Sequence, residues 1–281
     1  MKSQQTGPQI GFLGGGNMAS ALIGGLIARG ASAAEFSVGE PSAQTRQQLA
    51  QEFNVAVSAD NHAAIAGCAL VILAVKPQEA GKVLGALAPA LQSTRPLLLS
   101  IAAGIRIASL SRWVGPGVPV VRSMPNRPAL LGAGVTAVYA PPEVSAAQRE
   151  LAAEVLRAAG QVVWVSHESD LDVVTALSGS GPAYFFLLAE LMMQAAIGQG
   201  LDPEAARQLA IGTLHGAGAL ASASDGDLGR LRREVTSKGG TTESALGAFA
   251  AADLSGIVAR AMQAASQRSR ELAAQFGDPT R

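Results

Sequence analysis

Hydroxyl and glycine residues are concentrated in one stretch near the C-terminus that could bind a small anion. Gly239 and Gly240 stand between Ser237 on one side and Thr241 and Thr242 on the other. A helix-forming run follows, so we expect Thr241 or Thr242 to cap a helix whose first-turn N–H groups are free. The helix dipole favours an anion at that end, and the glycines let a ligand approach the backbone. A glycine-rich loop that only caps a helix is the alternative.

A second candidate site lies near the N-terminus, where residues 9–13 (Gln-Ile-Gly-Phe-Leu) predict a short buried strand. This strand leads into a G-x-G-x-x-A pattern in which Gly14 allows a tight turn and Gly16 allows close approach of a pyrophosphate. Ala19 keeps the following helix close to the sheet. Because the pattern stands between a strand and a helix, it predicts a dinucleotide-binding site.

Glu40 ends the next predicted strand, residues 36–39, about twenty residues beyond the glycines. An acidic residue at this place usually accepts hydrogen bonds from the adenosine ribose and would repel a 2′-phosphate. Ser42 and Arg46 lie just beyond and could still hold that phosphate. The sequence therefore leaves the choice between NADH and NADPH open, and a solvated strand end is the plain alternative for Glu40.

Other residues follow the carboxyl ends of predicted parallel strands, where ligands of such sheets bind. The apolar strand 69–75 runs into a Lys-Pro pair, and the strand 97–101 is followed by small residues that leave room for a nicotinamide ring. Asn61 is expected to cap a helix or to contact the cofactor, and Lys76 is as well explained as an exposed lysine. The candidates from the two strands are Ala74, Val75, Lys76, Pro77, Ala102, Ala103 and Gly104.

Two regions differ in their pattern. Residues 1–166 alternate strands and helices at least four times, which predicts an α/β, doubly wound and mainly parallel sheet. Residues 167–281 carry only helical signals, which predicts an all-α domain. Apolar stripes such as Phe185, Leu188 and Met192 indicate a core or an interface, and we expect the helices to pack against a second subunit.

Composition excludes several functions. The formal net charge of the 281 residues is zero, which argues against a nucleic-acid or acidic-membrane partner, and no apolar run reaches membrane-spanning length. A single cysteine, Cys68, excludes an internal disulfide, and the polar residues 1–9 do not form a secretion signal. We therefore expect a cytoplasmic protein. No metal site is expected, since Asp170 and Asp172 are better explained as caps of a helix.

The chain resembles pyrroline-5-carboxylate reductase over nearly its whole length. The matching segments are 14–18 (Gly-Gly-Gly-Asn-Met), 74–77 (Ala-Val-Lys-Pro), 100–104 (Ser-Ile-Ala-Ala-Gly), 124–126 (Met-Pro-Asn), 176–184 and 235–246. The last two are the specific ones, because the first alone would fit many dehydrogenases. Lys238, where proline is common, and Arg127, where threonine is frequent, depart from the family pattern.

The resemblance implies a Rossmann domain that binds NADPH or NADH, followed by an all-helical dimerisation domain whose dimers often assemble into a decamer. It adds Asn17, Met18 and Asn126 to the cofactor residues. It implies that 1-pyrroline-5-carboxylate is reduced to L-proline, with the substrate carboxylate on the backbone of residues 237–242. The substrate residues are then Ser237, Gly239, Gly240, Thr241 and Thr242, with the Thr242 hydroxyl hydrogen-bonded to the ring nitrogen as the catalytic group.

This chemistry needs no strong base or metal, because a protonated imine is already electrophilic and the protein has only to orient the reactants. Two alternatives remain open. A related imine or 3-hydroxyacid oxidoreductase usually relies on a lysine in its helical domain, whereas here Lys238 is the only lysine of that region and lies in the loop. The other alternative is a protein that senses the dinucleotide without turnover.

Overall fold

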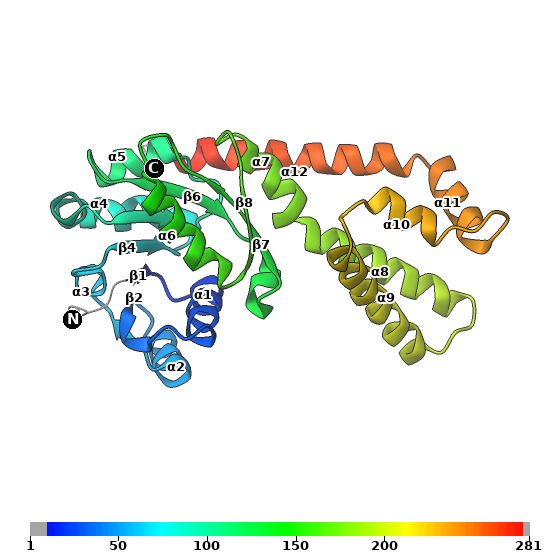
Figure 1. Ribbon diagram of the computed structural model, residues 1–281, viewed down its shortest axis with the longest axis horizontal. Coiled ribbons are helices and arrows are strands. Elements are labelled where there is room, and N and C mark those ends of the chain that lie inside the picture. The colour runs from blue at the N-terminus through cyan, green and yellow to red at the C-terminus, as the bar shows by residue number, and fades with distance from the viewer. Residues whose placement is uncertain (1–9, 278–281) are drawn as a thin grey trace. The chain divides into compact units, whose positions relative to one another are not determined.

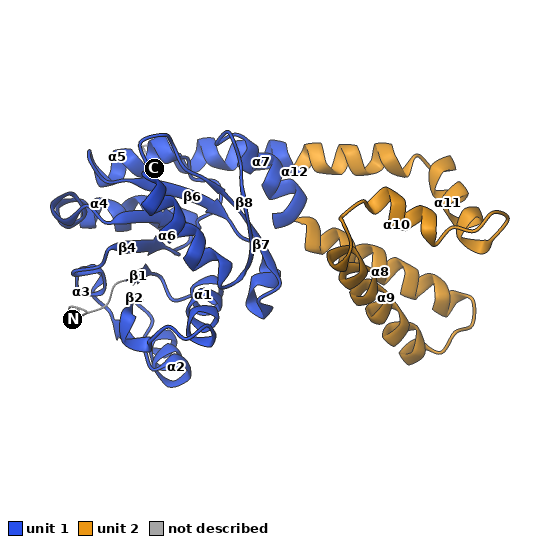
Figure 2. Ribbon diagram, in the orientation of Figure 1, with its two compact units in different colours: residues 1–179, 265–281 blue, residues 180–264 orange. Residues whose placement is uncertain are grey.

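The computed structural model describes residues 10–277, so the polar residues 1–9 lie outside the described chain. The chain divides into two compact units, one made of residues 1–179 with 265–281 and one made of residues 180–264 (Figure 2). The first unit therefore contains the C-terminal segment as well as the N-terminal part of the chain. The division of the sequence into domains at 166 and 167 stays a prediction.

An eight-stranded sheet forms the centre of the first unit, in the order β3-β2-β1-β4-β5-β6-β7-β8 (Figure 1). The pairing of β6 with β7 is antiparallel, and the other neighbouring strands are parallel. The prediction of a doubly wound, mainly parallel sheet is therefore confirmed. The strands are β1 (Ile10–Leu13), β2 (Phe36–Gly39), β3 (Ala56–Ser58), β4 (Leu70–Leu73), β5 (Leu97–Ser100), β6 (Val120–Met124), β7 (Gly134–Tyr139) and β8 (Gly160–Trp164).

Helices cover both faces of this sheet, which explains why the central strand β4 is apolar at every position. All four residues of β4 are buried. Leu70 and Ile72 belong to one hydrophobic cluster and Val71 and Leu73 to another, as the alternation of side chains along a strand requires. The helices of this unit are α1 (Asn17–Ala28), α2 (Ala43–Phe53), α3 (Asn61–Ile65), α4 (Pro77–Thr94), α5 (Ile107–Val114), α6 (Ala146–Arg157) and α7 (Asp170–Val174).

The second unit is helical throughout, as predicted. It comprises α8 (Gly181–Gly198), α9 (Pro203–Ala223), α10 (Leu228–Glu234), α11 (Thr241–Ala251) and the first part of α12 (Leu254–Gly277). Asp202 caps α9 by accepting from the Ala205 N–H, and Asp227 caps α10 by accepting from the Arg230 N–H. The N-termini of α9 and α10 are thus stabilised by side chains that are local in sequence.

Large apolar side chains of α8 are exposed to solvent in the single chain. Phe185 and Phe186 are 61% and 60% exposed, and Leu188 and Met192 are also exposed. The predicted apolar stripe is therefore not a core within one chain. Among the described residues, the stretch Asp170–Gly198 has the length and apolar composition of a membrane-spanning helix, so the expectation that no apolar run reaches that length was wrong. The helices α11 and α12 reach that length and composition only when they are taken together as one bent pair.

Candidate functional site

The turn after β1 has the tight geometry expected of a dinucleotide-binding loop. Gly14 has φ +97°, and its N–H donates to the Gly39 carbonyl at 2.8 Å. A Cβ at this position would come within 2.8 Å of the Ala74 carbonyl oxygen, so both the conformation and the space require glycine.

The packing of the protein does not require a glycine at position 16. Gly16 is the exposed N-cap of α1, no side chain caps that helix, and a Cβ built there meets no atom within 4 Å. The missing side chain therefore leaves open room at the positive end of α1, which suits a pyrophosphate. Ala19, in contrast, is fully buried and packs α1 against the sheet.

A cleft of about 700 Å³ lies beside this turn, at the carboxyl ends of β1, β2 and β4. Several residues predicted to bind cofactor line it together, namely Gly14, Gly16, Glu40, Asn61, Ala74, Val75 and Lys76. Pro77 follows as the first residue of α4, and Asn17 lines a neighbouring hollow with Gly16. The cleft lies where open α/β sheets bind their ligands, and the residues present fit a dinucleotide.

Every polar atom of Glu40 has a partner within the chain. Its two carboxylate oxygens accept from the Gly15 N–H at 2.9 Å and from the Ser42 N–H at 2.8 Å. Its own N–H donates to the Ser58 carbonyl at 2.9 Å, and its carbonyl accepts from Arg46 Nη1 at 2.7 Å. Glu40 is therefore fixed in the cleft wall and is not a freely solvated strand end.

Asn61 does not cap its helix, because Asp60 takes that role by accepting from the His62 N–H. The Asn61 side chain instead lies directly over Gly39, where a Cβ would collide with its Oδ1. Asn61 thus lines the cleft beside Gly39.

The remaining cofactor candidates lie elsewhere in the first unit. Ala102 is buried and Ala103 exposed after β5, and Gly104 faces Phe276 of α12. Asn126 is buried, and its side chain donates to the Ser178 carbonyl at 3.1 Å and accepts from the Val135 N–H at 2.9 Å. Met18 is half-buried against the core. The cofactor roles of these five residues stay predictions.

The candidate anion-binding loop belongs to the second unit. Gly239 has φ +71°, and the Gly240 N–H donates to the Ser237 carbonyl at 3.1 Å. Gly240, in extended conformation, is the N-cap of α11, and no side chain caps the helix. The prediction that Thr241 or Thr242 is the cap was wrong, because the helix begins one residue earlier than expected. Thr241 and Thr242 instead form its first turn.

Glu243, in the first turn of α11, forms a hydrogen bond back to this loop. Its Oε2 accepts from the Gly239 N–H at 2.7 Å, so a carboxylate of the chain already occupies one amide of the loop. Thr242 is half-buried, whereas Ser237, Gly239 and Thr241 are exposed. The sequence pattern did not single out Glu243, although an acidic residue at the third helical position is a known capping signal.

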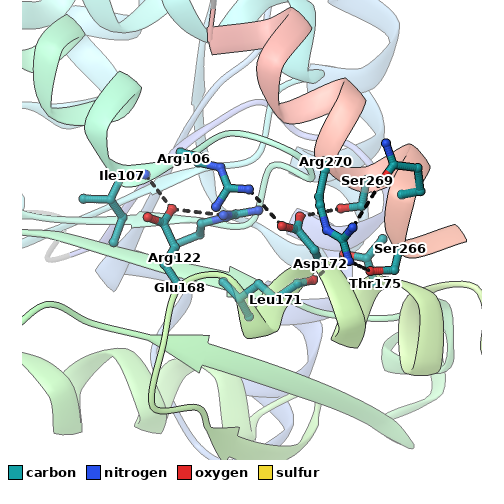
Figure 3. Close-up of polar contacts among 11 residues, drawn as sticks. Arg106, Ile107, Arg122, Glu168, Leu171, Asp172, Thr175, Ser266, Ser269 and Arg270 are labelled. Atoms are coloured by element: carbon teal, nitrogen blue, oxygen red, sulfur yellow. Dashed lines mark hydrogen bonds and ion pairs between the residues drawn. The ribbon is translucent and has the colours of Figure 1, made fainter. Parts of the chain in front are cut away.

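A buried ionic cluster joins four elements of the first unit (Figure 3). Asp172 accepts from Arg106 Nη2 at 2.9 Å and from the Ser269 hydroxyl at 2.8 Å, and Glu168 accepts from Arg122 Nη1 at 3.0 Å. The Asp172 side chain is only 2% exposed, and burial lowers the pKa of Arg122, against the effect of Glu168.

The expectation that Asp172 caps a helix was therefore wrong, because its carboxylate pairs with residues distant in sequence. Asp170, in contrast, does accept from the His167 N–H before α7. Within residues 10–277, no group of three or more His, Cys, Asp and Glu side chains is arranged to hold a metal ion.

Two protein families match the chain. The pyrroline-5-carboxylate reductase dimerisation family matches residues 168–272, and the family of coenzyme F420-dependent NADP oxidoreductases matches residues 9–104. The second match covers the glycine turn and Glu40, and the first covers the loop before α11.

The similarity to known proteins extends over almost the whole chain. Pyrroline-5-carboxylate reductase from Pseudomonas aeruginosa is 48% identical over 270 residues, covering 96% of this chain and 98% of its own. The solved pyrroline-5-carboxylate reductase of Coxiella burnetii superposes with TM-score 0.91 at 36% identity, covering 95% and 98% of the two chains. The Plasmodium falciparum enzyme, solved with NADP bound, superposes with TM-score 0.81 at 28% identity, covering 95% and 99%. The chain therefore belongs to the pyrroline-5-carboxylate reductase family, whose members are NAD(P)H-dependent oxidoreductases that act on a cyclic imine.

Proposed function

We propose that residues 237–242 bind the carboxylate of 1-pyrroline-5-carboxylate and that Thr242 is the catalytic residue. The uncapped N-terminus of α11 carries this proposal, because its first-turn N–H groups and the helix dipole favour an anion. Gly239, in the left-handed region, exposes the loop backbone on the side where no side chain stands. Ser237, Gly240 and Thr241 complete the substrate site.

The Thr242 hydroxyl donates or accepts a hydrogen bond at the ring nitrogen and so orients the imine. The nitrogen of a protonated imine already activates the neighbouring carbon, so the residues have to position the ring and not to supply a strong acid or base. The absence of an added base among the proposed residues fits this requirement. The product is L-proline.

The cofactor is proposed to lie in the cleft beside the glycine turn. Gly14 and Gly16 would hold the pyrophosphate, Glu40 the adenosine ribose, and Ala74, Val75, Lys76 and Asn61 the remaining cleft wall. When bound, reduced nicotinamide supplies the hydride that reduces the imine carbon. Asn17, Met18, Ala19, Pro77, Ala102, Ala103, Gly104 and Asn126 complete the proposed cofactor residues.

We further propose that the chain forms a homodimer through its helical region and works in the cytoplasm. The exposed side chains of α8, such as Phe185 and Leu188, are the apolar surface that a second copy would cover. A decamer built from such dimers is the larger assembly proposed. If a second copy covers this surface, the apolar composition of the stretch Asp170–Gly198 is explained by the dimer and needs no membrane.

The test is to assay Thr242→Val and Thr242→Ser beside the unchanged protein. The proposal expects the valine variant to lose roughly a hundredfold in kcat with an unchanged melting temperature, and the serine variant to keep most activity. Equal kcat in the valine variant would remove Thr242 from the reaction. A monomer on size-exclusion chromatography would overturn the dimer.

A further inference from the structure

We propose that Phe276, near the end of α12, is a positioning residue for the segment after β5 that takes the nicotinamide ring. The inference rests on the cofactor site proposed above and concerns its nicotinamide end, residues 102–104. Residues 265–281 belong to the first compact unit, whereas the start of α12 belongs to the second (Figure 2). The last part of α12 therefore packs with the sheet.

The segment after β5 lies beside the cleft already described. β5 is the parallel neighbour of β4, and its last residue, Ser100, pairs with Leu73. The Ile101 N–H donates to the Leu73 carbonyl at 3.1 Å, so the chain leaves the sheet next to Ala74 of the cleft wall. Ligands of such sheets bind at this edge, beyond the carboxyl ends of the strands. Residues 102–104 are thus placed to meet one end of a dinucleotide.

Gly104 turns the chain here and has no side chain with which to hold its own place. It is buried, and its φ of +73° lies in the left-handed region. A Cβ at Gly104 would lie 3.5 Å from Phe276 Cδ2 and 3.6 Å from Leu272 Cβ, so α12 covers the open side of this glycine. Phe276 also packs against the hydrophobic cluster that contains Ala102 and Ile105. Its ring therefore supports the backbone of the turn.

The end of α12 is held against α5, the helix that follows this segment. Arg112 Nη2 on α5 donates to the Gly277 carbonyl at 2.6 Å. A Cβ at Gly277 would lie only 2.9 Å from the Ser109 hydroxyl oxygen, so the two helices are in close contact there. These contacts keep Phe276 in place against the turn.

The buried ionic cluster holds the other end of the same segment (Figure 3). Arg106 is bound by Asp172, which also accepts from Ser269 of α12. The Ile107 N–H donates to Glu168 Oε1 at 2.7 Å. Because no side chain next to α5 caps it, this distant carboxylate satisfies one of its free N–H groups. Residues 106–107 are therefore fixed without the aromatic ring, and loss of the ring should loosen chiefly residues 102–105.

A positioning residue for the nicotinamide should act on the chemical step. The proposed reaction needs no strong acid or base, so its rate depends on how well the nicotinamide and the imine are aligned. Phe276 acts through the backbone of residues 102–104 and not on the reactants. The adenosine and pyrophosphate half is proposed to lie at Gly14, Gly16 and Glu40, so its binding should not depend on Phe276.

The experiment compares Phe276→Ala with the unchanged full-length protein. The ligands are the reduced dinucleotide that the unchanged protein binds more tightly and the matching ADP-ribose, which lacks the nicotinamide. In calorimetry the affinity for ADP-ribose should stay the same and that for the dinucleotide should fall. Hydrogen exchange of the backbone N–H groups should quicken at residues 102–105 and not at residues 11–18. In the assay with 1-pyrroline-5-carboxylate, kcat should fall about tenfold or more.

Val118→Ala is the matched control. Val118 belongs to the same hydrophobic cluster but precedes β6, at the edge of the sheet opposite the cleft. This variant should lower the melting temperature and leave kcat and the exchange of residues 102–105 unchanged. Phe276→Leu keeps an apolar side chain against the turn and should restore most of kcat. Arg112→Ala removes only the bond to the Gly277 carbonyl, so it should give the pattern of Phe276→Ala with smaller changes, even if Phe276→Ala does not fold.

Three results would decide against the role of Phe276. In whichever of Phe276→Ala and Arg112→Ala folds, they are an unchanged kcat, an unchanged hydrogen exchange at residues 102–105, or equal losses of affinity for the dinucleotide and for ADP-ribose. Equal losses would show a general disturbance of the unit and not a shift of the nicotinamide end. Failure of both ligands to bind to the unchanged protein would instead remove the proposed cofactor site itself.

Discussion

The Glu243 carboxylate accepts a hydrogen bond from the Gly239 N–H at 2.7 Å, which ties the first turn of α11 to the loop before it. Gly239 has a positive φ and no side chain of its own, so this bond and the bond from the Gly240 N–H to the Ser237 carbonyl together hold the loop backbone. The loop proposed to bind substrate is therefore held in part by a residue outside it.

Glu243→Ala should consequently raise KM for 1-pyrroline-5-carboxylate roughly three- to tenfold and change kcat much less, because a charge-assisted hydrogen bond at an exposed site is lost. Glu243→Gln keeps an acceptor oxygen and should restore most of the affinity. Steady-state kinetics at saturating cofactor measures both constants. An alanine variant with unchanged KM would mean that the loop holds its shape without Glu243.

Gly16→Ala separates cofactor binding from folding. A Cβ at Gly16 meets no protein atom, so the melting temperature should stay within about one degree, since surface changes of this kind cost little. The methyl group would enter the room proposed for the pyrophosphate, and dinucleotide affinity should fall about tenfold or more. Gly14→Ala is the contrasting variant, because its Cβ would strike the Ala74 carbonyl and destabilise the fold. Unchanged dinucleotide affinity in Gly16→Ala would place the pyrophosphate elsewhere.

Asp172→Ala should destabilise the protein more than its position on a short helix suggests. The substitution leaves both Arg106 and the buried Ser269 hydroxyl without their acceptor, at a cost of about 2–3 kcal/mol in the free energy of unfolding. Asp170→Ala, which removes only the bond from the His167 N–H, should cost about 1 kcal/mol or less. Urea unfolding curves of the two variants make the comparison. Equal losses would show that the buried cluster is not a stabilising contact.

Cys68 should be slow to react with thiol reagents in the folded protein. Burial raises the pKa of its thiol, and the hydrogen bond with Ser37 lowers it only in part, so the reactive thiolate is scarce near neutral pH. Labelling should accelerate as the pH rises toward the raised pKa, and at about pH 8 it should be at least roughly a hundredfold slower than in denaturant. Mass spectrometry after timed alkylation gives both rates, and similar rates would contradict the burial of Cys68.

The sequence was sufficient for features that depend on neighbours along the chain. The apolar run of β4 and the glycine turn before α1 predicted the parallel sheet and its cleft, because both signals are local. The N-cap of α11 was misassigned because hydroxyl residues usually outrank glycine as caps, whereas here Gly240 takes that place.

Long-range contacts could not be predicted in the same way. The pairing of Asp172 with Arg106 and Ser269 joins residues separated by 66 and 97 positions, and nothing in the local pattern of any of them signals the others. The same holds for the fixed Glu40, whose carboxylate partner Gly15 lies 25 positions earlier. The sequence showed that residue 40 is acidic, but it did not show that the backbone N–H groups of Gly15 and Ser42 hold its carboxylate.

The most direct test of the account is the oxidation of NADH and of NADPH by the purified protein in the presence of 1-pyrroline-5-carboxylate, followed as the loss of reduced-nicotinamide absorbance. We predict turnover that depends on the imine, yields proline as the product, and is lost in Thr242→Val. Cofactor that binds but is not oxidised in the presence of the imine would contradict the assignment and favour a protein that senses the dinucleotide.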